Sequence, residues 1–248
     1  MPNDIPLRPR SVVCLSGGMD SCVTAALAAR DTEAFALHFS YGQRTEARET
    51  AAARAVAERL GLRQFLHLHI DIFRQIGGSA LTDAAISVPD AKPDFGRGPA
   101  APDATGEAIP VTYVPFRNAH FLSAAVSWAE VLGATRVYIG AVEQDSSGYP
   151  DCRPAYYEAF QQLVRTGTRD GQIEIVTPLI TLSKAQIVRL GLECNAPLDL
   201  TWSCYREEQE ACGACESCVL RLRAFAAAGV RDPIAYAQKD RNLHAPGS

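Results

Sequence analysis

An open, mostly parallel α/β sheet with helices on both faces is the fold that this sequence predicts. Short apolar runs without polar alternation recur along the chain, as is typical of buried parallel strands. Longer segments with helical apolar spacing separate these runs, so that strand and helix alternate. A turn with two adjacent glycines follows the first run and precedes a helix, an arrangement that suits an anion-binding loop.

The first half of the chain contains three predicted strands, each followed by a helix or a turn. Apolar runs predict strands at residues 11–15, 34–39 and 65–70. A run of small residues predicts a helix over residues 22–30, and apolar spacing predicts another over 45–60 with Gly61 as its C-terminal cap. The prolines and glycines of residues 87–110 predict a long loop or a mobile lid.

The second half continues the same alternation. Apolar spacing predicts helices over residues 118–133 and 154–164, and apolar runs predict strands at 136–141 and 173–176. A last helix is expected over residues 183–190, with Ser183 as its N-cap. These elements divide the chain into an α/β domain at residues 1–200, a cysteine-containing segment at 201–230 and a tail at 231–248.

Composition narrows the class of protein. The chain has 248 residues, of which 47% are hydrophobic and 21% charged, which is globular composition. Its net charge of −4 argues against extensive neutralisation of nucleic-acid phosphates. No apolar run reaches the ~20 residues that span a bilayer, and no secretory signal is visible. We therefore expect a cytoplasmic protein with no membrane or nucleic-acid partner.

The turn at residues 16–21, the glycine loop, has the composition of a phosphate site. Gly17 and Gly18 let the main chain approach phosphate oxygens, and the following helix contributes its N-terminal dipole. Ser16 and Ser21 add hydroxyl donors, and Asp20 could hold a magnesium ion. The Gly-Lys-Ser/Thr ending of a Walker loop is absent. A plain strand-to-helix turn with a serine cap is the structural alternative.

The motif Ser-Gly-Gly-x-Asp-Ser resembles the pyrophosphate-binding loop of the adenine-nucleotide α-hydrolase-like, or PP-loop, ATP pyrophosphatases. Further motifs follow in order: YGQR at 41–44, YVPFRN at 113–118, SGYPDCR at 147–153, TPL at 177–179 with Lys184, and C-terminal cysteines. Together they resemble the 7-cyano-7-deazaguanine synthase family of that superfamily, over roughly residues 12–229. Phe116 is a departure, because many relatives carry glycine there.

The resemblance implies a reaction and a set of site residues. It implies that ATP activates 7-carboxy-7-deazaguanine and that free ammonia supplies the nitrogen of the nitrile, in queuosine precursor biosynthesis. Asp20, Arg117 and Lys184 are the expected catalytic residues. ATP would contact Leu15, Ser16, Gly17, Gly18, Met19, Asp20, Ser21, Arg44 and Lys184, and the deazapurine would contact Asp145, Tyr149, Asp151 and Arg153. A homodimer is compatible with this interpretation.

Four of the eight cysteines form a candidate metal site. Cys204, Cys212, Cys215 and Cys218 supply the thiolates of a closed tetrahedral site, and Gly213 permits a tight turn within it. The spacing alone is compatible with zinc or with an iron–sulfur cluster. The family resemblance favours zinc in a structural role. Four unliganded buried thiols are the structural alternative.

Three other functions remain open at this point. A tRNA-modifying PP-loop enzyme would share the glycine loop, although the net charge of −4 argues against it. A deazaguanine-transferring relative would use the same activation but modify a protein. A binding module would use the four-cysteine segment to recognise a partner.

Overall fold

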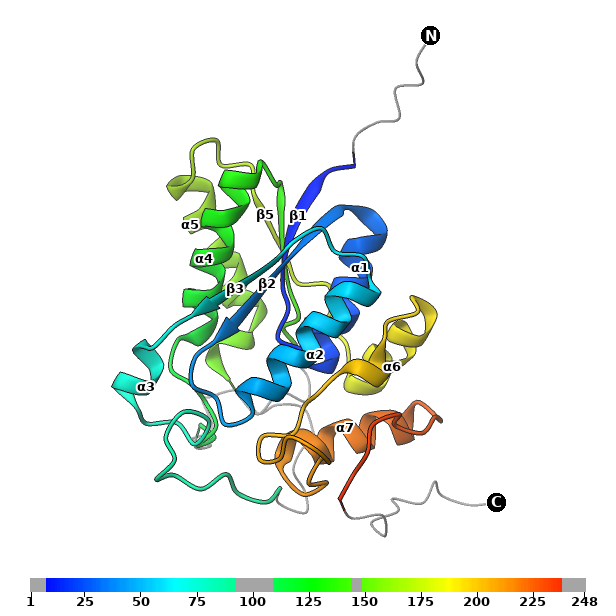
Figure 1. The fold of residues 1–248 in the computed structure, drawn as a ribbon. Coiled ribbons are helices and arrows are strands. Elements are labelled where there is room, and N and C mark those ends of the chain that lie inside the picture. Colours follow the sequence, from blue (N-terminus) through cyan, green and yellow to red (C-terminus); the bar gives the residue numbers. More distant parts are fainter. Residues whose placement is uncertain (1–7, 92–108, 144–148, 238–248) are drawn as a thin grey trace.

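In the part of the chain that the structure describes, five parallel strands form one sheet, in the order β3-β2-β1-β4-β5 (Figure 1). The computed structural model describes residues 8–91, 109–143 and 149–237. The strands are β1 (Arg10–Cys14), β2 (Glu33–Ser40), β3 (Phe65–His69), β4 (Arg136–Ile139) and β5 (Glu174–Val176). All their pairings are parallel, which confirms the predicted class of sheet.

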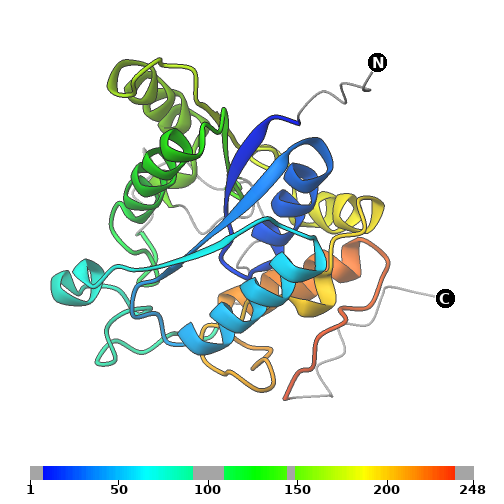
Figure 2. The ribbon, with the colours of Figure 1, turned by 45° about the horizontal axis from the view of Figure 1, so that its top comes forward.

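Helices cover both faces of this sheet, because each strand presents apolar side chains to both sides. Val12 and Cys14 of β1 pack in the cluster that contains α4 (Arg117–Leu132) and α5 (Pro154–Gly167). Val13 faces the opposite way, toward α1 (Met19–Asp31) and α2 (Glu46–Arg59). The two views in Figures 1 and 2 show α4 and α5 on one side of the sheet and α1 and α2 on the other.

Two further helices form a layer outside α1. Apolar side chains of α6 (Lys184–Glu193) and α7 (Glu216–Ala227) share a buried cluster with Met19, Val23 and Leu27 of α1. The predicted cap at Ser183 is confirmed as a capping box, in which its hydroxyl and the Gln186 side chain each bond the other residue's backbone nitrogen.

Several short elements and one helix were not predicted from the sequence. They are α3 (Ile72–Ile76), η2 (Pro150–Cys152), η3 (Leu198–Leu200) and α7. α7 begins inside the cysteine motif, where metal-ligand spacing obscured its helical period. Most of the loop predicted at residues 87–110 lies outside the described residues, as does residue 145.

A buried ion pair holds the end of the described chain against α7. Arg221 donates to both carboxylate oxygens of Asp232 at 2.7 and 2.9 Å, and the two side chains are 2% and 3% exposed. Arg221 also donates to Thr201, and Tyr236 donates to Asp232. This network fixes the segment that follows η3 against the segment that follows α7.

None of the helices in the described part of the chain has both the length and the apolar content that crossing a bilayer requires.

Candidate functional site

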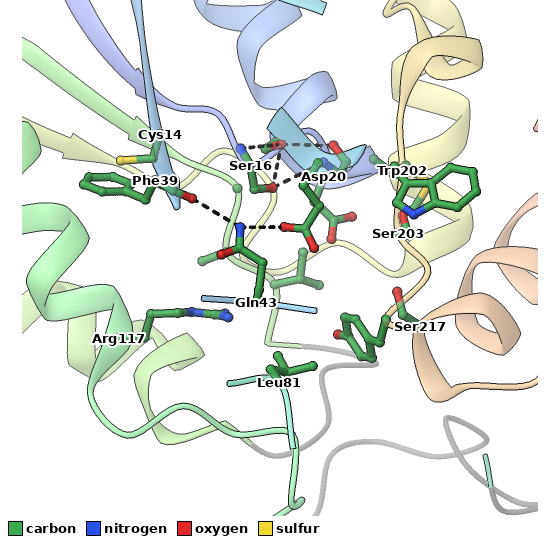
Figure 3. A pocket seen from close by; sticks show the side chains of 18 of the residues that line it. Cys14, Ser16, Asp20, Phe39, Gln43, Leu81, Arg117, Trp202, Ser203 and Ser217 are labelled. Atoms are coloured by element: carbon green, nitrogen blue, oxygen red, sulfur yellow. Dashed lines mark hydrogen bonds between the residues drawn. The ribbon is translucent and has the colours of Figure 1, made fainter. Parts of the chain in front are cut away.

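A cavity of about 290 Å³ opens at the carboxyl ends of β1 and β4 (Figure 3). β1 is the strand at which the chain reverses its direction across the sheet, because β2 and β3 lie on one side of it and β4 and β5 on the other. Open parallel sheets bind ligands at such a switch point. The walls of the cavity come from the segments after β1, β2 and β4, from the starts of α4 and α6, and from residues 202–221.

The glycine loop forms one wall, with Gly17 turned away from the cavity. Gly17 has a φ of +89°, and a Cβ added to it would lie 2.5 Å from the backbone oxygen of Glu49 in α2. Its carbonyl oxygen also accepts a hydrogen bond from the Trp202 backbone nitrogen at 2.8 Å. Only glycine therefore allows the loop to approach α2 this closely.

The other predicted loop residues line the cavity, namely Leu15, Ser16, Gly18, Met19, Asp20 and Ser21. The Ser16 and Ser21 hydroxyl oxygens lie 3.0 Å apart, and the Ser21 hydroxyl donates to the Gly18 carbonyl oxygen. Gly18 is the N-cap of α1, and because glycine has no side chain, no cap bond occupies the first N–H groups of this helix. The first backbone N–H groups of α1 therefore face a space that an anion could enter.

Asp20 and Lys184 meet across the cavity wall although 164 positions separate them in the sequence. The Lys184 ammonium lies 2.6 Å from Asp20 Oδ2, while Asp20 Oδ1 is buried without a hydrogen-bond partner. A carboxylate oxygen in this state, beside an anion site, fits a hard divalent cation such as Mg²⁺. The capping box at Ser183 sets the position of Lys184 at the first turn of α6.

Arg117 enters the cavity from the first residue of α4, and Figure 3 shows it pointing in from the side away from the labelled Trp202. Its Nη1 donates to the Tyr41 hydroxyl at 2.9 Å, and its guanidinium lies over the Tyr41 and Phe121 rings. Its Nε is buried without a partner. Within the described residues no carboxylate lies at salt-bridge distance from it. A permanently charged guanidinium with an unpartnered N–H group fits a substrate carboxylate or phosphate.

Phe116, the departure from the family pattern, is the N-cap of α4 and has a φ of +58°. This left-handed conformation favours glycine, the residue that the family resemblance leads us to expect at this position.

Arg44 lines the cavity, but its guanidinium donates hydrogen bonds to backbone carbonyl oxygens of residues 80–86. Its Nε donates to the Ala80 carbonyl oxygen, and its Nη2 donates to those of Asp83 and Ile86. The arginine therefore holds residues 80–86 beside the cavity, and its expected contact with ATP stays a prediction.

Of the residues predicted to contact the deazapurine, some line the cavity and others do not. Tyr149 lines the cavity, with its hydroxyl oxygen 2.8 Å from the Thr112 hydroxyl oxygen. Asp151 does not line it; the Asp151 carboxylate is buried and accepts the Asn118 backbone N–H in the first turn of α4. Arg153 is the N-cap of α5 and is not among the cavity-lining residues. Asp145 lies outside the described residues.

The rest of the cavity wall is formed by residues that were not predicted from the sequence. The aromatic ones are Phe39, Tyr41, Phe121, Trp202 and Tyr205, and the polar ones include Gln43, Glu49, Ser203 and Ser217. Burial raises the pKa of Glu49 to about 7, although hydrogen bonds from Thr45 and Gln43 oppose the shift. No signal in the sequence marks Glu49, which lies one helical turn after Thr45 in a segment whose pattern indicates only a helix.

The four C-terminal cysteines converge, as expected of a metal site. Their sulfur atoms all lie within 4.8 Å of one another. Backbone nitrogens of Arg206, Glu207 and Cys212 donate to Cys204 Sγ at 3.3–3.4 Å, and those of Ala214 and Cys215 donate to Cys212 Sγ. Such N–H groups stabilise thiolates, so the donor set fits a closed tetrahedral metal ion. Gly213 has the positive φ of +70° that the turn requires.

The remaining cysteines and the described histidines carry no visible chemistry. Burial raises the pKa of Cys14, Cys22 and Cys152 to about 12, so these thiols stay protonated at neutral pH. None of the histidines in residues 8–91, 109–143 and 149–237 lines the cavity.

Known proteins resemble this chain over nearly its whole length. A family model described as queuosine biosynthesis protein QueC matches residues 10–229. The 7-cyano-7-deazaguanine synthase of Acidobacterium capsulatum is 70% identical over 234 residues, covering 94% of this chain and 99% of that relative. The enzyme of the same name from Koribacter versatilis is 62% identical, covering 93% and 94%. That from Chlorobium phaeobacteroides is 52% identical, covering 93% and 98%.

Proposed function

This chain belongs to the QueC family of queuosine biosynthesis proteins and is an enzyme of the synthase type, and we propose that it converts 7-carboxy-7-deazaguanine to 7-cyano-7-deazaguanine. The proposed co-substrates are ATP and free ammonia. AMP and pyrophosphate are the proposed by-products.

One observation carries this proposal: the glycine loop, whose composition suits an anion, faces the same cavity as a cation that has no acidic partner among the described residues. The glycine loop and Lys184 line one part of it, and Arg117 enters from α4. An ionised carboxylate resists nucleophiles, so one of its oxygens must first become part of a leaving group. Holding the triphosphate on the glycine loop and the acid on Arg117 would place the reacting oxygen beside the α-phosphorus.

The proposed chemistry uses this cavity twice. A carboxylate oxygen attacks the α-phosphorus of ATP, and pyrophosphate leaves. Ammonia then forms a C–N bond to the acyl carbon, and AMP leaves with the electron pair of the broken C–O bond. The resulting amide oxygen attacks a second ATP in the same way, and departure of the second AMP with loss of the nitrogen-bound protons gives the nitrile.

The chain's own residues would hold charge during these steps. Lys184 would balance negative charge that develops on the departing pyrophosphate, and the N–H groups at the start of α1 would contact phosphate oxygens. Asp20 would hold Mg²⁺, which supplies neutralising charge to the phosphates. The four cysteines would hold Zn²⁺, which would fix residues 204–218 as part of the cavity wall.

The test is mass spectrometry of a reaction containing 7-carboxy-7-deazaguanine, ATP, Mg²⁺ and ammonium. The expected products are the free nitrile and AMP, with two AMP formed for each nitrile. ADP and phosphate in place of AMP would refute adenylation. Deazapurine attached to a protein, or turnover only with tRNA, would refute the free nitrile as the product and favour one of the related enzymes.

A further inference from the structure

The proposed reaction needs a proton acceptor inside the cavity. Ammonia enters with three hydrogens on its nitrogen, and the nitrile nitrogen carries none, so all three must leave as protons. When ammonia attacks the acyl adenylate, the nitrogen becomes positively charged and can leave again as ammonia until it loses a proton. A side chain with a pKa near neutrality performs this task most efficiently.

The described part of the cavity wall offers few candidates for this role. It contains no histidine, and its only carboxylates are Asp20 and Glu49. Asp20 is paired with Lys184 at 2.6 Å. The Cys14, Cys152 and Tyr41 side chains have their pKa raised to about 12 by burial, so they are protonated at neutral pH and cannot accept a proton.

Glu49 differs from these groups because its carboxylate has hydrogen-bond donors but no ion-pair partner in the described residues. The Thr45 hydroxyl lies 2.7 Å from Glu49 Oε1, and Gln43 Nε2 lies 3.3 Å from Oε2. The Tyr41 backbone N–H donates to Gln43 Oε1, which turns the amide nitrogen toward Glu49. Gln43 Nε2 also donates to the Phe39 backbone oxygen at 3.4 Å, as Figure 3 shows.

The same contacts accommodate a protonated Glu49. Thr45 Oγ1 also lies 3.1 Å from the carbonyl oxygen of Cys204. A protonated Glu49 could donate to Thr45, whose own proton would then go to that carbonyl. Both protonation states are therefore hydrogen-bonded, and a proton could enter and leave without rearrangement of the wall.

We propose that Glu49 is the catalytic base that removes a proton from the nitrogen nucleophile during amide formation. The proposal rests on the proposed function above. The ammonia nitrogen forms its bond to the acyl carbon, the Glu49 carboxylate accepts one proton from that nitrogen, and AMP leaves with the C–O electron pair. The products are the amide, AMP and a neutral Glu49, which then releases its proton to water.

The charges around Glu49 are consistent with this role. Arg117 of α4 faces it and lowers its pKa, Glu46 on the same helix raises it, and burial dominates. Tyr41, which also lies near it, is protonated. Asp20 and Lys184 line the same cavity as a mutually compensated pair. The resulting value of about 7 leaves Glu49 able both to accept and to release a proton at neutral pH.

The test separates activation from amide formation with the variant Glu49→Gln. Substrate-dependent exchange of labelled pyrophosphate into ATP, in ammonia-free buffer, reports adenylation alone. We expect this exchange to stay within about twofold of the unmodified enzyme, while amide and nitrile formation fall by about 100-fold or more. The pH profile of amide formation should lose its rising limb near pH 7, and Glu49→Asp should restore part of the rate.

Glu58→Gln is the matched control, because Glu58 lies on the same helix, is exposed and is outside the cavity wall. It should leave both rates unchanged. Equal loss of exchange and amide formation in Glu49→Gln would overturn the proposal, as would an undiminished amide rate. Absence of exchange in the unmodified enzyme would refute the proposed function itself, so the two failures are distinguishable.

Discussion

Two arginines, Arg221 in the C-terminal segment and Arg117 at the start of α4, show how differently two regions of this molecule are built. Arg221 in the C-terminal segment is surrounded by acceptors, with Asp232 on both arms of its fork and Thr201 beside it. Arg117 in the cavity has a tyrosine hydroxyl and aromatic rings, and its Nε has no partner. The Arg221 guanidinium is therefore paired within the chain, whereas Arg117 Nε and Asp20 Oδ1 are buried without a partner and are left for a ligand.

The same contrast separates the cysteine cluster from the glycine loop. Five backbone N–H groups donate to Cys204 and Cys212, so these sulfurs are already embedded in a closed shell. Asp20 Oδ1 is buried and has no donor. Satisfied polar groups contribute to stability, and unsatisfied ones cost stability until a ligand binds. Changes in the C-terminal segment should therefore affect folding, and changes in the cavity should affect catalysis.

The largest effect is expected from removing a metal ligand. Cys212→Ser should lose the proposed zinc ion, and the variant should unfold or aggregate, because a structural zinc site contributes on the order of 10 kcal/mol to folding. Metal content by mass spectrometry and a thermal melt measure this. Cys194→Ser is the control, since Cys194 lies outside the cluster and its thiol donates only to the Gly191 carbonyl oxygen. A folded, fully active Cys212→Ser enzyme would contradict the structural role.

The next effect is expected from the buried ion pair. Asp232→Ala should lower the free energy of unfolding by about 3–5 kcal/mol, because it leaves the Arg221 charge buried. Asp90→Ala removes the partner of Arg206 from a pair in which Asp90 is 71% exposed, and it should cost less than about 1 kcal/mol. Chemical denaturation of both variants provides the comparison. Equal losses would show that the difference in burial is not the controlling factor.

Arg117→Gln should lower the activity of the enzyme and leave its stability unharmed. We expect kcat/KM for the deazapurine acid to fall by about 100-fold or more, while the melting temperature stays the same or rises, because a cation without an acidic partner has been removed. Arg165→Gln, on the exposed face of α5, is the control and should change neither quantity. If Arg117→Gln unfolds the enzyme instead, Arg117 belongs with Arg221 as a structural residue.

A smaller effect concerns stability and pH at Glu49. Its pKa is raised from 4.5 to about 7 in the folded chain, so the folded state favours the protonated form. The stabilisation is complete below pH 4.5 and is lost as the pH rises through 7. Relative to Glu49→Gln, the ligand-free enzyme should therefore lose about 1–3 kcal/mol between pH 5 and pH 8. Urea denaturation across this range measures it, and a pH-independent difference would contradict the shift.

What could be predicted from the sequence was local. The strands, the glycine loop and the cysteine cluster are contiguous or nearly so, and their composition alone indicates what they form. The functions of Arg44 and Asp151 depend on partners far along the chain, the carbonyls of residues 80–86 and the amide of Asn118. Nothing near these two residues in the sequence distinguishes a ligand contact from a structural one.

The positions of Glu49 and Trp202 in the cavity wall were not predicted from the sequence, for a related reason. Both lie on elements whose own patterns indicate only a helix and a loop. They reach the cavity because Gly17 packs against α2 and accepts a hydrogen bond from Trp202. This packing is a property of the assembled layers, which no periodicity along the chain reveals.

Isotope tracing of the substrate oxygens tests the central claim most directly. The acid is prepared with ¹⁸O at both carboxylate positions and converted with ATP and ammonium, and the nucleotide products are weighed by mass spectrometry. If the cavity transfers adenylate to the acid oxygen and then to the amide oxygen, each nitrile formed should leave two AMP molecules with one ¹⁸O apiece. Unlabelled AMP, or ¹⁸O recovered in inorganic phosphate, would contradict the account.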